Sequence, residues 1–260
     1  MDTINLPTAP GFTGAVAFVA AFYIVGFPLK ALGSLLYGQP LNQKWIFFLL
    51  APFYSPRSWR CCSNLQEGHL KFAIKTTVFW LTIALAVYAT YWYLVHRFNP
   101  SGVVRSYMAF PAFYVLTETL GALFRLLFLL SGRLLPPVHN RPLLSHSLSH
   151  FWGRCWNRWV GEWLRHLCYY PMMRRPRFGV LVAFTASGIW HEIIITLPHY
   201  LRGNNAQFGP MALYFILQGI AMLIEPRRWS PALKRTYLYA VVIIPAPLVA
   251  SPAFLHAFFL

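Results

Sequence analysis

The sequence predicts an all-α membrane protein, built as a single bundle of about six transmembrane helices. Its 260 residues are 57% hydrophobic and 11% charged, whereas soluble domains contain about 25% charged residues. The mean hydropathy is +0.49. Because one span needs about 20 residues, the chain has room for one such bundle and not for two. We therefore expect one membrane-embedded domain over residues 1–260.

Six apolar windows define the expected spans. They fall near residues 11–30, 72–95, 107–130, 178–200, 208–225 and 237–258. A further apolar stretch at 45–54 ends in Pro-rich sequence and is too short to span comfortably. The first ten residues contain Asp2 and no Lys or Arg, so a signal peptide is not expected.

Basic residues indicate how these spans are threaded. The loops at 55–71, 131–177 and 226–236 are rich in Lys and Arg, whereas those at 96–106 and 201–207 together hold three arginines. Rich and poor loops alternate, so the rich loops are expected in the cytosol and both termini on the far side. This topology accounts for the formal net charge of +16. Nucleic acid is therefore not expected as a partner.

The loop at 131–177 contains an amphipathic segment rich in tryptophan. From Ser149, which can act as an N-cap, the chain runs without proline to Tyr170, so one cytosolic-side interfacial helix is expected. One sector of this helix would hold Trp152, Trp156, Trp159, Trp163 and Tyr170, and roughly the opposite side Arg154, Arg158 and Arg165. Indole rings favour the headgroup level, and the arginines can attract an anion or simply anionic lipid. Asn157 would lie on the flank with its amide accessible, or act as a solvated or capping residue.

His191 lies inside the fourth predicted span, roughly 20 Å along the helix and past the bilayer midplane. It shares a face with Ser187 and Gly188, so a substrate, a water molecule or another helix can approach the imidazole. An ionisable side chain at this depth indicates a function, with a hydrogen bond between helices as the alternative. Glu192 points elsewhere and is expected to support the site by pairing with a basic or hydroxyl group.

Other charged side chains inside the spans are expected to be structural. Glu118 and Arg125, seven residues apart on one face of the third span, can form an intramembrane ion pair. Glu225 closes the fifth span beside Arg227 and Arg228, so an interfacial ion pair is expected there.

A buried neutral imidazole, an accessible amide and cytosolic arginines together fit one kind of chemistry. His191 can accept a proton from the hydroxyl of a lipid-soluble alcohol while that oxygen attacks a thioester. Asn157 can hydrogen-bond the thioester or the developing charge. Arg154 and Arg158, beside Trp152 and Trp156, can bind coenzyme A through its phosphates.

Three sequence blocks resemble a known family. They are Phe-Trp-Gly-Arg-Cys-Trp-Asn at 151–157, Phe-Thr-Ala-Ser-Gly-Ile-Trp-His-Glu at 184–192 and Tyr-Phe-Ile-Leu-Gln-Gly-Ile-Ala-Met-Leu-Ile-Glu at 214–225. In this order, within about residues 145–228, they resemble the wax synthase-like branch of the membrane-bound O-acyltransferases (MBOAT). They look especially similar to fungal members that acetylate terpenoid alcohols in secondary metabolism.

The resemblance implies a multi-pass acyltransferase of internal membranes such as the endoplasmic reticulum. An acyl-CoA, with acetyl-CoA favoured, would enter from the cytosol as co-substrate, and a lipophilic alcohol from the bilayer. The resemblance also implies that His191 is the base and Asn157 a positioning group. No bound cofactor or metal is expected.

Three alternatives stay open at this point. A wax-ester or sterol-ester synthase would use long-chain acyl-CoA instead. His146 and His150 have the spacing of one histidine box of membrane di-iron enzymes, although such enzymes need several boxes. A non-catalytic transporter or scaffold could use His191, Glu118 and Arg125 along a proton or substrate pathway.

Overall fold

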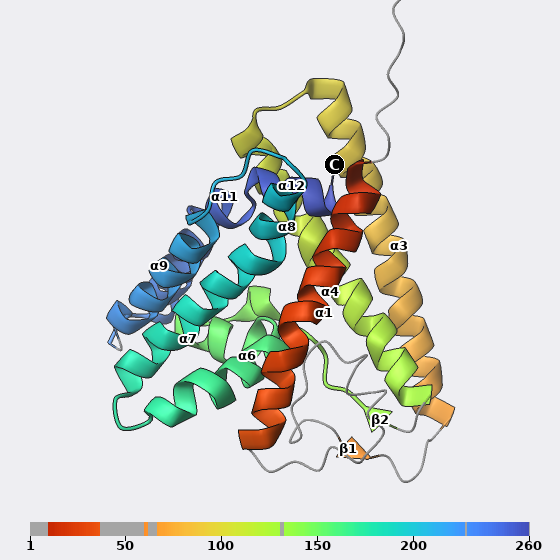
Figure 1. Ribbon diagram of the computed structural model, residues 1–260. Coiled ribbons are helices and arrows are strands. Elements are labelled where there is room, and N and C mark those ends of the chain that lie inside the picture. The colour runs from red at the N-terminus through yellow and green to blue at the C-terminus, as the bar shows by residue number, and fades with distance from the viewer. Residues whose placement is uncertain (1–9, 37–59, 62–66, 131–132, 227, 260) are drawn as a thin grey trace, which may run out of the picture.

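The computed structural model describes residues 10–36, 60–61, 67–130, 133–226 and 228–259, which form a helical bundle (Figure 1). The longer helices are α1 (Pro10–Leu36), α3 (Glu67–Phe98), α4 (Gly102–Leu130), α7 (Pro176–His191), α9 (Pro210–Ile224) and α10 (Pro231–Ile243). In the described part, extended pairing is limited to β1 (Arg60–Cys61) and β2 (Arg133–Leu134), which are antiparallel. The predicted all-α class is confirmed.

Short elements connect the longer helices. Between α4 and α7 they are β2, η1 (Pro142–Leu144), α5 (Leu148–His150), the π-helical turn η2 (Phe151–Cys155), α6 (Arg158–Leu164), the π-helical turn η3 (Arg165–Tyr169) and η4 (Tyr170–Met172). After α7 come the π-helical turn η5 (Glu192–Thr196) and α8 (Leu197–Leu201). The chain ends with α11 (Ala246–Val249) and α12 (Pro252–Phe258).

Several helices are long and apolar enough to cross a membrane. Four segments meet this description by length and composition: Gly68–Phe98, Gly102–Leu130, Pro176–Leu201 and Pro231–Val249. Two apolar helical segments are shorter, Gly14–Pro28 and Pro210–Ile224. The protein is therefore an integral, multi-pass membrane protein, as predicted. The apolar stretch at 45–54 lies outside the described residues.

One expected span is wrong in its extent. The window at 237–258 is broken, because α10 ends at Ile243 and the chain turns before α11 and again before α12. Proline causes these breaks, since Pro245, Pro247 and Pro252 lack the N–H that an uninterrupted helix needs.

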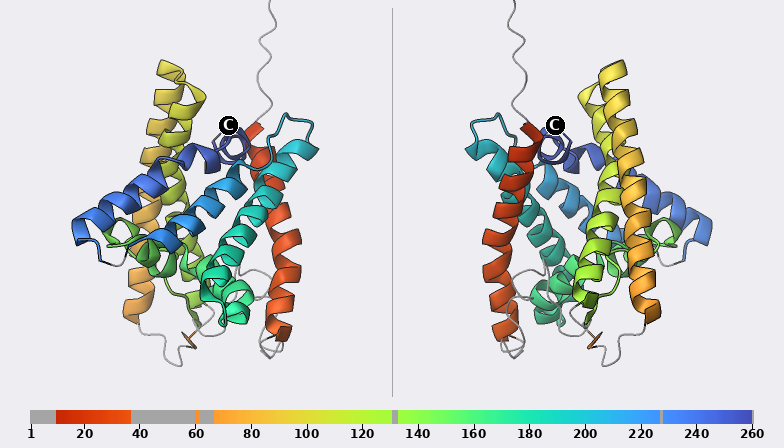
Figure 2. Two further views of the ribbon diagram at one scale, coloured as in Figure 1. Left: turned by 90° about the vertical axis from the view of Figure 1, so that its left-hand side faces the viewer. Right: turned by 90° about the vertical axis from the view of Figure 1, so that its right-hand side faces the viewer.

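The arrangement of the helices agrees with the alternation of basic loops. In Figure 1 the start of α1 lies at the same end of the bundle as the C-terminus and the α3–α4 and α8–α9 connections. The strand pair β1–β2 lies at the opposite end. Figure 2 shows α3 and α4 side by side, with α1 on the other side of the bundle, where it packs on α12 and η5. The arginine-poor connections thus share one end of the molecule with both described chain ends.

Two glycines bring α7 and α9 close together. A Cβ atom added at Gly188 would lie 2.7 Å from the Cα of Ala212, and one added at Gly219 would lie 3.0 Å from the Cβ of Phe184. Small residues at such crossings let helix backbones approach within van der Waals contact, which drives association in lipid. The largest buried apolar cluster lies beside this pair and includes Trp190, Ile194 and Phe254.

A carboxylate completes the contact between the two helices. Oε1 of Glu192 accepts hydrogen bonds from the backbone N–H groups of Gly209 (2.9 Å), Met211 (3.0 Å) and Ala212 (3.2 Å) at the start of α9. The first N–H groups of a helix have no partners within it, and its N-terminus favours negative charge. The expectation that Glu192 pairs with a basic or hydroxyl group is therefore wrong, because the side chain faces the N-terminus of α9.

Replacing Gly188 by Ala should lower the free energy of unfolding by about 1–3 kcal/mol, because the new methyl group meets backbone that no side-chain rotation can move. Urea unfolding in detergent micelles measures this change. Gly26→Ala in α1 is the matched control, since a Cβ there meets nothing within 4 Å. Equal stability of the two variants would contradict the tight α7–α9 contact.

Candidate active site

The predicted interfacial helix from Ser149 to Tyr170 is interrupted. Its N-cap is Ser147, whose hydroxyl oxygen accepts the N–H of His150 at 3.1 Å. The π-helical turn η2 ends at Cys155, and the chain turns at Asn157 before α6 begins. Asn157 has φ 31° and ψ 65°, a left-handed conformation that asparagine tolerates better than most residues.

This break separates the tryptophans that were expected to share one sector. Trp152 packs edge-on against Phe184 of α7 and near Phe215 of α9. Trp163, beyond the break, lies beside Trp190 in the main apolar cluster. The left-handed residue Asn157 redirects the chain between Trp152 and Trp163. A single continuous helix therefore cannot predict the positions of both tryptophans.

The side chain of Asn157 has a defined orientation. Its Oδ1 accepts the backbone N–H of Val160 at 3.3 Å, so the residue is also the N-cap of α6. A backbone N–H can only donate, and the amide oxygen must therefore be the atom that faces Val160. The Nδ2 group is left as a hydrogen-bond donor at the cavity wall.

His191 also has a defined orientation, at the last residue of α7. Its Nδ1 lies 2.7 Å from the backbone oxygen of Ser187, and a carbonyl can only accept, so Nδ1 carries the proton. In the neutral ring Nε2 is then free to accept a proton. The ring stacks on Phe215, with centroids 4.4 Å apart. Ser187 thus supports His191 through its backbone carbonyl.

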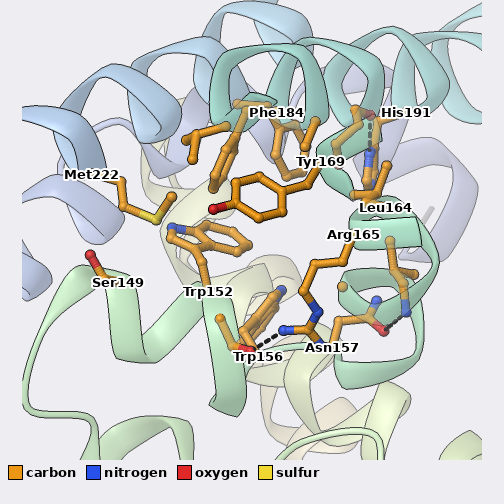
Figure 3. A pocket seen from close by; sticks show the side chains of 17 residues that line it. Ser149, Trp152, Trp156, Asn157, Leu164, Arg165, Tyr169, Phe184, His191 and Met222 are labelled. Atoms are coloured by element: carbon orange, nitrogen blue, oxygen red, sulfur yellow. Dashed lines mark hydrogen bonds between the residues drawn. The ribbon is translucent and has the colours of Figure 1, made fainter. Parts of the chain in front are cut away.

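Two cavities meet at His191 and Asn157. The larger has a volume of about 290 Å³ and reaches the surface at the exposed Ser149 (Figure 3). The smaller has a volume of about 90 Å³ and is lined by buried or half-buried residues from α4, η2, α9 and the C-terminal segments. The residues that line both are Trp152, Trp156, Asn157, His191 and Phe215. The predicted base and the predicted amide donor therefore share the wall between two spaces.

Trp152 is locked in this wall by a residue that the sequence analysis missed. Its Nε1 donates to Oε1 of Gln218 at 3.1 Å, and Nε2 of Gln218 donates to the backbone oxygen of Val241 at 2.7 Å. Gln218 is completely buried in α9. A lone amide within the apolar window 208–225 was the available signal, because a buried side-chain amide needs hydrogen-bond partners.

The predicted phosphate-binding arginines lie outside both cavities. Arg154 is exposed and Arg158 half-buried, and neither lines a cavity wall. Arg165, from the same predicted row, does line the larger cavity, where its guanidinium donates to the backbone oxygen of Gly153 (Figure 3). The predicted Trp152 and Trp156 both line it as well.

The expected ion pair between Glu118 and Arg125 is replaced by contacts with the segment that follows β2. Oε1 of Glu118 lies 3.3 Å from Nδ1 of His139, and Nε of Arg125 donates to the backbone oxygen of Leu135 at 3.2 Å. Both side chains project from the same face of α4, and each contacts this segment rather than the other side chain.

Among the described residues, Glu225 contacts backbone and hydroxyl groups of α5. Its carboxylate accepts the N–H groups of Leu148 (2.7 Å) and Ser149 (3.1 Å) and the hydroxyl of Ser149 (2.9 Å). These contacts join the end of α9 to α5 beside the mouth of the larger cavity. Arg227, one of its expected partners, lies outside the described residues.

His146 and His150 stack with their centroids 4.1 Å apart, and Sγ of Cys155 lies 3.4 Å from Nδ1 of His150. Partial burial lowers the pKa of His150, and electrostatic interaction with the neighbouring His146 and Arg154 lowers it further. Across the residues that can be placed, no group of three or more His, Cys, Asp or Glu side chains could hold a metal ion.

Comparison with known proteins bears on this site. Residues 135–217 match the model of the membrane bound O-acyl transferase family, and this segment contains both Asn157 and His191. The chain is 29% identical to a probable long-chain-alcohol O-fatty-acyltransferase of Arabidopsis thaliana, over 86% of this chain and 69% of that relative. These matches support the wax synthase-like branch of the membrane-bound O-acyltransferases. They bear out an acyltransferase as the enzyme class.

Two further relatives match over shorter regions. An acyl-CoA–sterol O-acyltransferase of Arabidopsis thaliana is 30% identical over 61% of this chain and 46% of its own length. A long-chain-alcohol O-fatty-acyltransferase of Simmondsia chinensis is 36% identical over 34% of this chain and 27% of its own length. The chain thus spans less than half the length of these two relatives.

Replacing Asn157 by Asp or by Gly should lower the rate of acyl transfer by about 10²–10³, because both variants lack the Nδ2 donor. Asp keeps an oxygen for the Val160 N–H, and Gly tolerates the left-handed backbone, so both should fold. Initial rates with detergent-purified protein provide the measurement. Asn99→Gly is the control, since Asn99 is also left-handed (φ 43°) and lines neither cavity. Wild-type rates in both Asn157 variants would limit this residue to helix capping.

Proposed function

We propose that the protein is an acyl-CoA-dependent O-acyltransferase that esterifies the hydroxyl group of a lipophilic alcohol. The observation that carries this proposal is that His191 and Asn157 line the wall between two cavities. A two-substrate transfer needs this arrangement, because the alcohol oxygen and the thioester carbon must meet beside one base. The family match at 135–217 supports the same reaction.

The geometry suits direct attack by the alcohol. Nε2 of His191 accepts the hydroxyl proton while the alcohol oxygen bonds to the thioester carbonyl carbon. Nδ2 of Asn157 donates a hydrogen bond to the carbonyl oxygen as negative charge develops on it. The carbon–sulfur bond then breaks, and the proton passes from the imidazole to the sulfur. The products are an ester and free coenzyme A, and the imidazole regains its starting state.

The larger cavity fits the coenzyme A side of the reaction. It reaches the surface at Ser149, and Arg165 in its wall can attract phosphate. Arg154 and Arg158 lie at the same interfacial segment and can contribute at the entrance. This end of the molecule carries the basic loops, which fits entry of acyl-CoA from the cytosol. Internal membranes such as the endoplasmic reticulum are the proposed location.

We propose acetyl-CoA as the co-substrate and an alcohol of terpenoid type, as in secondary metabolism, as the acceptor. The support for a short acyl group is the resemblance of the blocks at 151–157, 184–192 and 214–225 to family members that acetylate terpenoid alcohols.

A second candidate is a wax-ester or sterol-ester synthase that uses long-chain acyl-CoA. The names of the relatives favour it, since they describe long-chain-alcohol O-fatty-acyltransferases and a sterol O-acyltransferase. The two candidates share the roles proposed for His191 and Asn157 and differ in the acyl group.

Detergent-purified protein, given a lipid extract from its host and radiolabelled acetyl-CoA or palmitoyl-CoA, should produce a labelled ester with acetyl-CoA. A palmitoyl ester instead would support the second candidate, and the absence of any ester would overturn acyl transfer. His191→Ala should abolish the product because the base is lost. His96→Ala is the control, since His96 makes the same kind of bond, with Nδ1 2.8 Å from the oxygen of Trp92, outside both cavities.

Arg165→Ala should raise the KM for acyl-CoA severalfold and change the KM for the alcohol less, because the lost guanidinium would contact phosphate. Arg154→Ala and Arg158→Ala, assayed in parallel, should have smaller effects, since neither residue lines a cavity. Steady-state kinetics with each substrate varied in turn make the comparison. Equal changes in both KM values for Arg165→Ala would instead indicate a structural role through its bond to Gly153.

A further inference from the structure

We propose that Glu118 of α4 is a positioning residue that, through His139, holds Asn157 in its active orientation. The connecting element is residues Leu134–Asn140, hereafter the strap, which lies between α4 and the turn at Asn157. This inference rests on the function proposed for Asn157 and names a further residue on which that function depends.

The strap contacts one face of α4 at four points, through one close polar contact, one hydrogen bond and two apolar contacts. Oε1 of Glu118 lies 3.3 Å from Nδ1 of His139, and Nε of Arg125 donates to the oxygen of Leu135 at 3.2 Å. Gly121 leaves space for Val138, whose side chain would collide with any Cβ atom at position 121. The side chain of Leu135 also packs against Phe128. These helix residues are spaced three or four apart, so they form one continuous surface.

The strap is in turn hydrogen-bonded to both sides of Asn157. The N–H of Asn140 donates to the oxygen of Cys155 at 2.8 Å, before the turn. After it, the N–H of Arg158 donates to the oxygen of Val138 at 2.7 Å, and Nε1 of Trp159 donates to the oxygen of Pro136 at 3.0 Å. The residues on either side of Asn157 are therefore fixed to an element that is itself fixed to a membrane helix.

The hydrogen bonds between the strap and the residues on either side of Asn157 matter because Asn157 has a left-handed backbone conformation. A left-handed backbone at a residue other than glycine persists when the surrounding structure determines it. His139 is 4% exposed, and its ring packs on Trp156 with centroids 4.6 Å apart. A displacement of His139 would thus reach the residue next to Asn157 directly. Glu118 lines neither cavity, whereas His139 of the strap lines the smaller one. Glu118 also interacts with Tyr114 of α4, whose ring centroid lies 6.1 Å from that of Trp156, so both of its neighbours lie beside the residue that precedes Asn157.

Glu118→Gln removes the carboxylate and keeps the shape of the side chain. It should lower kcat about tenfold and leave the KM for acyl-CoA within about twofold, since coupling between contacting residues is commonly of this size. In an Asn157→Gly background the same substitution should cause no further loss, because the group that it positions is absent. Thr119→Val is the matched control, since the Thr119 hydroxyl lies on the same helix and bonds to the oxygen of Trp80 in α3.

An equal loss in both backgrounds, or an equal loss with Thr119→Val, would overturn the proposal. A measurement without substrate separates this failure from a failure of the proposed function. Hydrogen exchange in the peptide covering residues 155–160 should be faster in Glu118→Gln and unchanged in Thr119→Val. Unchanged exchange in Glu118→Gln would refute the attachment even in a protein that catalyses another reaction.

Two substitutions that change only the size of a side chain test the same strap without removing a polar group. They can be used if the Glu118→Gln variant does not fold. Gly121→Ala should displace Val138 and lower kcat. Combining it with Val138→Ala should restore much of the lost rate, because the smaller side chain leaves room for the new methyl group. A rate that stays low in the double variant, with wild-type stability, would count against the strap.

Discussion

The contact between the Glu192 carboxylate and the N-terminus of α9 holds together the two helices on which the site is built. Where water is scarce, an unpaired backbone N–H costs several kcal/mol, and this single oxygen serves three of them. Glu192 directly follows His191, so the same contact sets the position of the imidazole relative to Phe215 on α9. The close approach at Gly188, one turn earlier, makes the arrangement possible.

Much of the fold and part of the site could be predicted from the sequence, because they follow from regular helices. All of the apolar windows except 237–258 correspond to described helical segments, and Ser187, Gly188 and His191 share a face because α7 is regular up to that point. Asn157 was predicted as an accessible amide on a continuous helix. Its backbone turn could not be predicted, since helical periodicity contains no sign of a residue that leaves the helix.

Partners distant in the sequence were the other source of error. Glu118 and Arg125 were paired with each other because they share a helix face, but each contacts the strap instead. The strap contains Pro136 and Pro137, has no regular periodicity and therefore gave no indication of its position. Likewise, Gln218 is a single amide in an apolar helix, and only the packing of η2 against α9 identifies Trp152 as its partner.

Three wide helical turns, at Phe151–Cys155, Arg165–Tyr169 and Glu192–Thr196, surround the site residues. Each contains one residue more than an α-helical turn, and one residue corresponds to about 100° of helical rotation. Comparison with a homologue whose helices are regular would therefore require a one-residue gap at each turn. An ungapped alignment through this region would match side chains that point in different directions.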